Sequence, residues 1–434
     1  MLFLLSIHLS LLSLASSIHP IPRISLSSSL FTQSFIKENN DYSSATGSLA
    51  SSRHLTAEDD LNLEYVGDVT TFAGVNGSSG STNGIGTNAQ FDVPRGVAIS
   101  PDGVYALVGD RDNHLIRHIV ISTAHVTTLA GLAGSWGSTN GIGTLARFRN
   151  PHGVSISADG VYALVADRGN HLIRHIVIST ASVTTLTGVA GSLGSTNGMG
   201  SSSRFNSPEE VSISPDGVYA LVGDIFNHQI RRIIISTASV TTLAGVNGSS
   251  GSSNGIGTNS RFRHPHGVAI FPDGVYALVA DYGNHLIRRI VISTASVTTL
   301  AGVAGSAGSS NGIGTNGRFH LPNGISISPD GMFALVSSPG NHLIRRITIS
   351  TACVTTLAGS AGVFGSTNGI GTNARLNYPN GISISLDGLY ALVADHMNHL
   401  IRHIIIKRLT DSPSLVPSSA PSLFPTSDLS MNGG

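Results

Sequence analysis

The sequence predicts an all-β fold, a six-bladed β-propeller of four-stranded antiparallel blades, from three observations. A short run, Asn-His-Leu-Ile-Arg in most copies, recurs six times at an interval of 57 residues. Each interval contains four apolar runs of strand length, separated by turn residues. A copy of the last of these runs also precedes the first interval. Such a fixed period indicates a solenoid, propeller or array, and four antiparallel strands per unit favour the propeller.

The second unit illustrates the four strands. Its runs are rich in β-branched and apolar residues, and Asp159-Gly160 between the first two is a strong hairpin signal. No run has the period of an amphipathic helix. The expected strands are residues 153–157, 161–166, 172–178 and 183–186. The runs are apolar on both faces, as expected for sheets packed between neighbouring sheets.

The first and last units indicate how the ring closes. The run that begins Val-Thr-Thr occurs at Val69 and then every 57 residues as far as Val354, but no copy follows Arg402. We therefore expect the strand at Val69 to complete the last blade beside residues 400–406. Closure of this kind removes the exposed edges that an open array of sheets would keep.

Composition narrows the classes of partner. Charged residues make up 11% of the chain and the formal net charge is zero, so there is no overall electrostatic attraction to nucleic acid or to an anionic membrane. Cys353 is the single cysteine, which excludes an intramolecular disulfide or a cysteine-based metal cluster. We expect a monomer with no stable membrane span.

The ends of the chain differ from the repeats. Residues 1–17 are expected to form a signal peptide, with a signal anchor or an organelle presequence as the alternatives, because the apolar start is short and small residues follow it. Residues 18–65 form a predicted disordered Ser-rich leader, 66–408 the propeller, and 409–434 a disordered Ser/Pro-rich tail. The protein is thus expected to be secreted or at the cell surface, where the sequons at Asn76 and Asn247 could carry glycans.

The repeat resembles the NHL repeat. Residues 110–117 read Asp-x-x-Asn-His-x-Ile-Arg after an apolar strand, and Pro-x-Gly and Ser-Pro-Asp-Gly precede them. The resemblance covers about residues 66–408 and implies a six-bladed propeller. Members of the family bind RNA or protein, form extracellular domains, or act as the peptidyl-hydroxyglycine amidating lyase. The cysteine patterns of RING and B-box domains do not occur here, so a ubiquitin-ligase role is not implied.

Three sets of recurring polar residues are interpreted as structural, because the same residue in blade after blade lacks the asymmetry of an active site. One set of aspartates precedes the signature and is expected to bond the turn after the second strand. The second belongs to the Asp-Gly hairpin turns, and the third comprises the signature histidines. The sets are Asp110, Asp167, Asp224, Asp281 and Asp395; Asp102, Asp159, Asp216, Asp273, Asp330 and Asp387; and His114, His171, His228, His285, His342 and His399.

The middle residue of Pro-x-Gly, by contrast, differs from blade to blade. This motif opens the innermost strand, whose start borders the central channel. The six residues are therefore candidates for a ligand-binding channel mouth. They are Arg95, His152, Glu209, His266, Asn323 and Asn380.

Alternate members of this set suggest a metal site. His152, His266 and Asn380 lie in every second blade and would point at one another, as the three protein ligands of a catalytic zinc do. Two of them match the zinc histidines of the amidating lyase, but Asn380 replaces the third, and asparagine is a poor zinc ligand. Glu209 is an alternative ligand. We nevertheless favour a polar channel mouth without a metal, so no cofactor is expected; zinc or, for a hard-cation site, calcium is the alternative.

A ring of arginines admits a third interpretation. With Arg149 and Arg263, these residues could form a basic face for RNA phosphates or an acidic partner. Alternatively, each could bond the carbonyls of its own loop, which we favour because the residue recurs in every copy but the first. They are Arg147, Arg204, Arg261, Arg318 and Arg375.

The leading function prediction is a non-catalytic propeller that binds a protein, peptide or glycan on its loop-bearing face. Trp136, Leu193 and Phe364 share one loop position and are candidate apolar contacts. A metal-dependent lyase-like enzyme and an RNA-binding propeller are the alternatives, and nucleic acid is the less expected partner.

Overall fold

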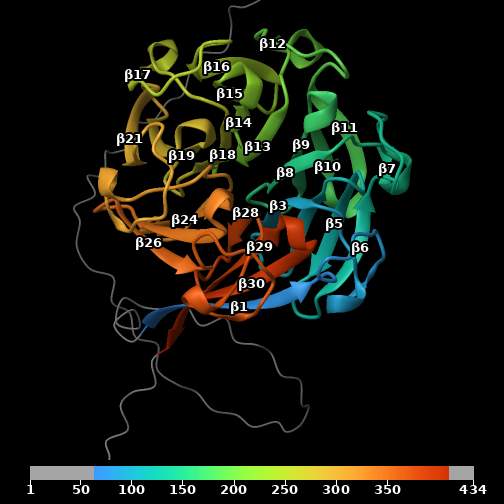
Figure 1. Ribbon diagram of the computed structural model, residues 1–434. Coiled ribbons are helices and arrows are strands. Elements are labelled where there is room, and N and C mark those ends of the chain that lie inside the picture. Colours follow the sequence, from blue (N-terminus) through green and yellow to red (C-terminus); the bar gives the residue numbers. More distant parts are fainter. Residues whose placement is uncertain (1–62, 410–434) are drawn as a thin grey trace, which may run out of the picture. The chain divides into compact units, whose positions relative to one another are not determined.

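The computed structural model describes residues 63–409, which form a closed ring of six antiparallel β-sheets (Figure 1). The predicted signal peptide, the predicted leader as far as residue 62 and the predicted tail from residue 410 lie outside the described residues, whereas Leu409 belongs to the last strand. The first strand begins at Leu63 rather than at residue 66. No helix of the described part is long and apolar enough to cross a membrane.

Each sheet is one blade, and its strands follow one another in order from the centre of the ring to the outside. The innermost strands are β3 (Pro94–Ile99), β8 (Pro151–Ile156), β13 (Pro208–Ile213), β18 (Pro265–Ile270), β23 (Ile325–Ile327) and β28 (Pro379–Ile384). The second strands are β4 (Tyr105–Asp110), β9 (Tyr162–Asp167), β14 (Tyr219–Asp224), β19 (Tyr276–Asp281), β24 (Phe333–Ser338) and β29 (Tyr390–Asp395). The third strands are β5 (Leu115–Val120), β10 (Leu172–Val177), β15 (Gln229–Ile234), β20 (Leu286–Val291), β25 (Leu343–Thr348) and β30 (Leu400–Leu409). The fourth strands are β6 (His125–Ala130), β11 (Ser182–Gly188), β16 (Ser239–Gly245), β21 (Ser296–Gly302), β26 (Cys353–Ala358) and β1 (Leu63–Ala73).

The prediction of four strands per blade was wrong, because every blade has a fifth. A two-residue strand from the Gly-rich loop pairs with the fourth strand, as Gly84 does with Val126. The loop thereby covers part of an outer edge whose backbone N–H and C=O groups would otherwise be open. The fifth strands are β2 (Gly84–Ile85), β7 (Gly141–Ile142), β12 (Gly198–Met199), β17 (Gly255–Ile256), β22 (Gly312–Ile313) and β27 (Gly369–Ile370).

The helices of the described residues are single 3₁₀ turns of two main kinds. One kind follows each fifth strand: η2 (Gly86–Asn88), η3 (Gly143–Leu145), η6 (Gly200–Ser202), η8 (Gly257–Asn259), η10 (Gly314–Asn316) and η12 (Gly371–Asn373). The other joins the second and third strands: η4 (Arg168–Asn170), η7 (Ile225–Asn227), η9 (Tyr282–Asn284), η11 (Pro339–Asn341) and η13 (His396–Asn398). One further turn, η5 (Ile178–Thr180), follows β10.

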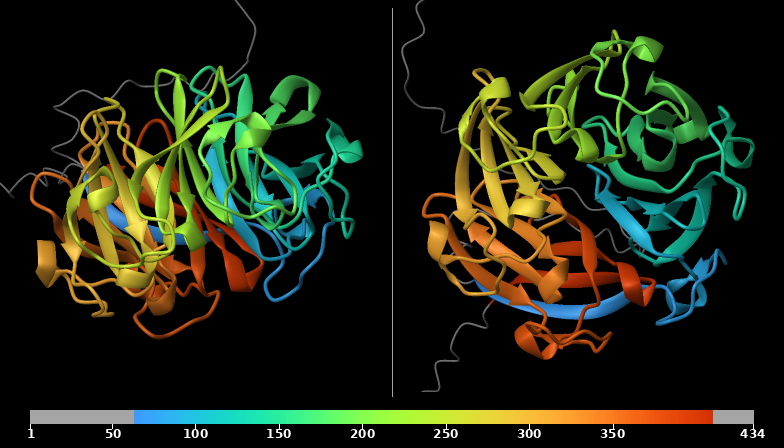
Figure 2. Two further views of the ribbon diagram at one scale, coloured as in Figure 1. Left: turned by 90° about the horizontal axis from the view of Figure 1, so that it is seen from above. Right: turned by 45° about the horizontal axis from the view of Figure 1, so that its top comes forward.

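The N-terminal strand lies in the sheet of the last blade. β1 pairs with β30, with Val69 opposite Ile404, and its other edge pairs with β27 (Figure 1). The innermost strands contact one another in order around the ring, and β28 contacts β3. The oblique view at the right of Figure 2 shows the blades arranged around a common centre. The first and last units of the repeat therefore meet, as the copy of the fourth strand at Val69 predicted.

The hydrophobic core is divided into six clusters, one between each pair of neighbouring blades. The cluster between the first two blades, for example, contains Leu107 and Ile116 from one sheet and Val154 and Val165 from the next. The cluster of Val97 and Leu392 joins the first blade to the last. Fully burying such a side chain contributes about 1.5–3 kcal/mol. Both faces of every sheet are therefore used, which explains the doubly apolar strands.

In five of the six blades, a buried ion pair fixes the end of the blade where the innermost strand begins. In the first blade, Asp110 accepts hydrogen bonds from Arg117 and Asn113, both at 2.8 Å, and from the backbone N–H of Asp92 at 2.7 Å. Arg117 also donates to Asn83 and is fully buried. The aspartate of the signature is thus structural, as predicted, but its main partner is the buried arginine of the same motif rather than the turn alone.

The signature histidine joins neighbouring blades. His114 is in the left-handed conformation (φ 61°) that ends the turn, and its Nδ1 accepts the backbone N–H of Asn150 from the next blade at 3.2 Å. His399 does the same for Val93 across the closure at 3.1 Å. Equivalent bonds occur at all six positions. The structural interpretation of these histidines is confirmed.

Candidate functional site

One end of the central channel opens into a cavity of about 420 Å³, which we call the mouth. All six predicted channel-mouth residues line it: Arg95, His152, Glu209, His266, Asn323 and Asn380. The backbone explains why they face inward. In five blades the pairing of the innermost with the second strand is interrupted after the proline, as between Pro94 and Val97. Such bulges redirect a side chain away from the regular sheet.

A second ring of residues lines the mouth and was missed in the sequence. Each member directly follows the second strand of its blade, and that strand ends beside the start of the innermost strand, as Asp110 does beside Pro94. The six residues are Arg111, Arg168, Ile225, Tyr282, Pro339 and His396. The sequence did contain a signal for this second ring. The residue after the second strand varies from blade to blade within an otherwise copied unit, which is the same property that identified the first ring.

Glu209 is the centre of a buried polar network. Its Oε1 lies 2.9 Å from Nδ1 of His152 and 3.5 Å from Nδ1 of His266, and its Oε2 lies 3.0 Å from Nε of Arg168. Asn323 reaches His266 at 3.1 Å, and the His266 ring stacks on Tyr282 with centroids 4.1 Å apart. The side chains of four blades are therefore linked across one side of the mouth.

Burial controls the charges in this network. It lowers the pKa of His152 to about 3 and that of His266 to about 4, although Glu209 opposes both shifts. Burial by itself would raise the pKa of Glu209, but the hydrogen bond from His152 and the positive charge of Arg168 favour the ionised carboxylate and hold this pKa well below its ordinary value. At neutral pH an ionised carboxylate thus faces neutral imidazoles.

The other side of the mouth contains polar groups without partners. His396 is only 4% exposed, and neither of its ring nitrogens has a hydrogen-bond partner among the described residues. The Nε atoms of Arg95 and Arg111 and Nε2 of His152 are also buried without one. Burial lowers the pKa of Arg95 to about 10, so its guanidinium stays charged at neutral pH. Buried polar atoms normally have partners, so these groups mark a place for a ligand or for water.

The residues of the predicted metal site do not fit zinc. His152, His266 and Asn380 all line the mouth, but Nδ1 of His152 faces Glu209 and Nδ1 of His266 faces Asn323 and Glu209. Within residues 63–409, no group of three or more His, Cys, Asp or Glu side chains is placed to hold a metal ion. The metal remains a sequence-based prediction, and we derive no chemistry from it.

Glu210 distinguishes the third blade. The other five blades have glycine here, and a Cβ added to Gly153 would lie 2.6 Å from Cα of Glu210 in the next blade. Burial, together with the charge of Glu209, raises the pKa of Glu210 to about 8. A second, largely protonated carboxyl group therefore follows Glu209 in the chain.

The face around the mouth also carries the predicted apolar contacts. Trp136, Leu193 and Phe364 are 62%, 61% and 66% exposed in the Gly-rich loops. The ring of Trp136 lies under the guanidinium of Arg149, at 4.8 Å. Arg149 is bonded through its carbonyl to the turn that also holds Arg168 of the mouth. These apolar side chains and the mouth thus share one face of the ring.

The arginine ring is structural, as we favoured. Arg147 donates to the carbonyls of Thr144 and Ala146 in its own loop. The same arrangement is found at Arg204, Arg261, Arg318 and Arg375. The guanidinium groups of the five ring arginines are therefore engaged within their own loops.

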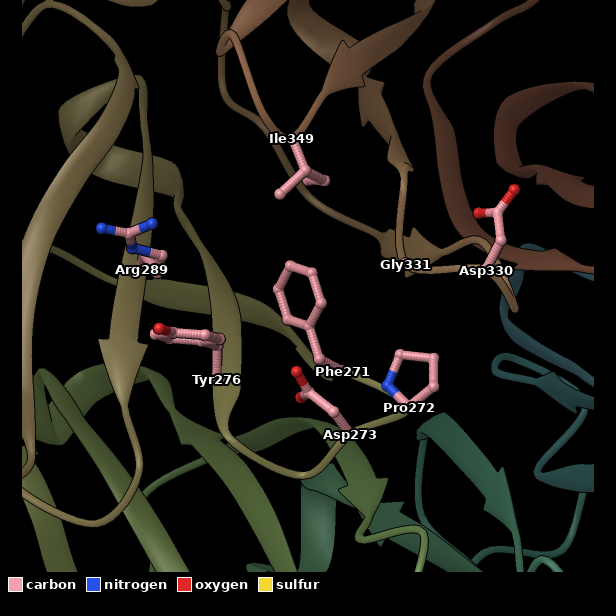
Figure 3. Close-up of a pocket in the computed structure, with 8 residues that line it drawn as sticks. All are labelled: Phe271, Pro272, Asp273, Tyr276, Arg289, Asp330, Gly331 and Ile349. Atoms are coloured by element: carbon pink, nitrogen blue, oxygen red, sulfur yellow. The ribbon is translucent and has the colours of Figure 1, made fainter. Parts of the chain in front are cut away.

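A second cavity, of about 360 Å³, lies at the opposite end of the blades, where the Asp-Gly turns are. Phe271 replaces the serine found in the other five blades and packs against Tyr276, with ring centroids 6.0 Å apart. Figure 3 shows Phe271 between Tyr276 and Ile349, with Asp330 from the next blade beyond it. None of the residues that line this cavity has a buried side-chain polar atom without a hydrogen-bond partner.

The fold is that of a six-bladed β-propeller with a polar cavity at one end of its axis, and comparison with known proteins narrows the class of propeller. A family model for the LVIVD repeat matches residues 152–188. The chain is 30% identical over 295 residues to the chloroplastic protein SUPPRESSOR OF QUENCHING 1 of Arabidopsis thaliana. It is 25% identical over 306 residues to human NHL repeat-containing protein 2. The chain carries an NHL-type β-propeller.

The relatives are longer proteins. The match covers 66% of this chain but 28% of the Arabidopsis protein, and 64% of this chain but 42% of the human protein. Among solved structures, an auxiliary nutrient binding protein from Bacteroides thetaiotaomicron has a TM-score of 0.61 at 16% identity, with 79% of this chain and 76% of that chain covered. At this level of identity, the structural similarity shows that the two proteins share a fold and nothing more.

Proposed function

We propose that the protein is a non-catalytic binding module that holds a peptide or protein partner on the face that bears the mouth. The observation that carries this proposal is the set of buried, unpartnered polar groups at His396, Arg95 and His152. Concave sites with a few convergent polar groups surrounded by apolar ones are the usual form of a ligand pocket.

The surroundings of the mouth support a macromolecular partner. Trp136 and Phe364 are exposed on the same face, and exposed aromatic side chains are typical anchors of protein interfaces. Human NHL repeat-containing protein 2 is named for its repeats and not for a reaction. A lyase-like enzyme remains the alternative, and finding a stoichiometric metal would favour it.

The test is selection of binding peptides with the purified full chain, followed by affinity measurement. The double variant Trp136→Ser/Phe364→Ser should weaken the selected peptides at least about tenfold, the range of an interface hot spot. Leu386→Ser is the matched control, because Leu386 is equally exposed, at 64%, in a turn at the opposite end of its blade. Equal loss in both variants, or binding to a glycan array in place of peptides, would contradict the proposal.

The location of the protein belongs to the same proposal. We propose that it is secreted or displayed at the cell surface, on the basis of its apolar start and the two sequons. Asn76 and Asn247 are both exposed in the loops. Expression in a secretory host followed by mass analysis would test this. A chain that keeps residues 1–17 and lacks glycan at both asparagines would contradict it.

A further inference from the structure

We infer that Arg95, Arg111 and His396 form an oxyanion site in the mouth, which takes a carboxylate or phosphate group of the ligand. The inference rests on the proposed binding function and specifies the chemical group that this site recognises. Arg95 and Arg111 belong to the first blade and His396 to the sixth, so the site lies across the closure of the ring.

Charge is the first argument. Three arginines line the mouth and only one carboxylate, Glu209, does so, while the histidines are held neutral. Arg168 is the arginine that pairs with Glu209. Arg95 and Arg111 therefore supply an excess of positive charge in a mostly buried place, where a ligand anion would be weakly screened.

Unused hydrogen bonds are the second argument. No hydrogen bond or ion pair of Arg95 is found within the described residues, and Arg111 meets only the half-exposed Asp112 at 3.5 Å. His396 is nine-tenths buried with both ring nitrogens unpartnered. A guanidinium offers five donors in a plane that matches carboxylate and phosphate oxygens. The neutral imidazole adds one donor, so together the three side chains can surround an oxyanion.

The position in the repeat is the third argument. Arg95 occupies a place that blades five and six fill with asparagine, and Arg111 a place that they fill with proline and histidine. An arginine needed only for the fold of a blade would be expected in every blade, as Arg117 and its five counterparts are. Arg95 instead occurs in the first blade alone, and an arginine at the place of Arg111 recurs only as Arg168, which pairs with Glu209.

The experiment uses the full chain and two probes, sodium phosphate and sodium acetate, titrated calorimetrically at constant ionic strength. At least one probe should bind saturably with one site per chain. Arg95→Asn, Arg111→Gln and His396→Asn should each weaken it, the arginine variants at least about tenfold, as expected for a charge-assisted hydrogen bond. Arg289→Gln removes the same charge from the opposite end of the blades and should bind like the parent protein.

The outcomes separate the two sources of the group. Binding of phosphate alone identifies a phosphorylated ligand, binding of acetate alone a carboxylate, and binding of both an oxyanion site of either kind. No saturable binding to a chain with an unchanged melting curve, or binding that Arg111→Gln leaves intact, would overturn the inference. Peptide binding that survives all three substitutions would also overturn it while leaving the proposed function standing.

Discussion

Arg345 is fully buried, yet the position that faces it with an aspartate in the other five blades is occupied by Ser338. The guanidinium of Arg345 donates only to neutral oxygens, including the carbonyls of Arg318 and Ser310. Burial lowers its pKa to about 10. The fifth blade therefore contains a buried positive charge without a carboxylate partner, whereas in each of the other five blades an aspartate neutralises the equivalent arginine.

We expect Ser338→Asp to stabilise the fold, because it supplies the missing carboxylate next to Arg345. Its other oxygen can accept the backbone N–H of His320, which Ser338 now accepts at 3.0 Å. The free energy of unfolding should increase by about 1–3 kcal/mol, somewhat less than the cost of breaking a buried ion pair. Urea unfolding measures it.

Two variants serve as controls for this prediction. Ser338→Asn has the shape of aspartate without its charge and should not stabilise. Asp395→Ser recreates the arrangement of the fifth blade in the sixth and should cost about 3–5 kcal/mol. A stabilisation by asparagine equal to that by aspartate would show that packing, not charge, is the missing contribution.

Removing residues 63–73 should open the ring. Without β1, the edges of β30 and β27 are both exposed and Val69 leaves the core between the last two blades. We expect a broad or lower-temperature melting transition and aggregation through the open edges. Calorimetry measures this, with the exposed-site substitution Thr70→Ser as the control. A deletion variant that melts at the same temperature and as sharply as the parent would refute the closing role of β1.

Stability should fall on acidification from about pH 6.5, because the mouth histidines are buried in their neutral form. His152 has its pKa lowered from 6.5 to about 3, so the unfolded chain takes up this proton first. The folded state has the full stability that neutral His152 allows above pH 6.5, and it loses this stability progressively as the pH falls below that value. Between pH 6.5 and pH 5 the loss is about 2 kcal/mol. Unfolding measured at both pH values should show it.

The matched variant for the pH experiment is His152→Asn, since asparagine occupies this position in the fifth and sixth blades. It removes one titrating group and should reduce the difference between the two pH values by about 2 kcal/mol. An unchanged difference would mean that the pKa of His152 is the same in the folded and the unfolded chain.

Zinc should not bind stoichiometrically. Asn380 is a weak ligand and the Nδ1 atoms of His152 and His266 already face polar partners. Elemental analysis of protein purified without chelators should find well below one zinc per chain. One zinc per chain, absent from the double variant His152→Ala/His266→Ala, would instead favour the enzyme alternative.

The fold could be predicted from the sequence because each of the six repeats carries the same strand and turn signals at the same spacing. Six aligned copies of Asp-Gly and of the signature define the strands, and the copy at Val69 predicts the pairing with β30. The fifth strand was missed, because two residues within a Gly-rich loop, such as Gly84 and Ile85, are too few to show an alternating pattern.

The site could be predicted only in part. Variation within the Pro-x-Gly motif located the first ring of the mouth, including His152 and Glu209. The second ring was missed because Arg111 and His396 lie in a turn, where variability is ordinarily tolerated. Threefold symmetry predicted that His152 and His266 face Asn380, but Glu209 lies between the histidines in the chain and its carboxylate binds both. The spacing of the repeats predicts where each blade lies, but it does not predict which rotamers the side chains of the mouth adopt.

The pairing of Leu63 with Leu409 determines how the ring can be attached to anything else. Both residues lie beyond the ends of the blades that carry the Asp-Gly turns, whereas Arg95 and His396 line the opposite end. The two points of attachment are thus neighbours on the side remote from the mouth. A tether joined at either point would present the mouth outward, so the propeller is suited to display its binding face from a single stalk.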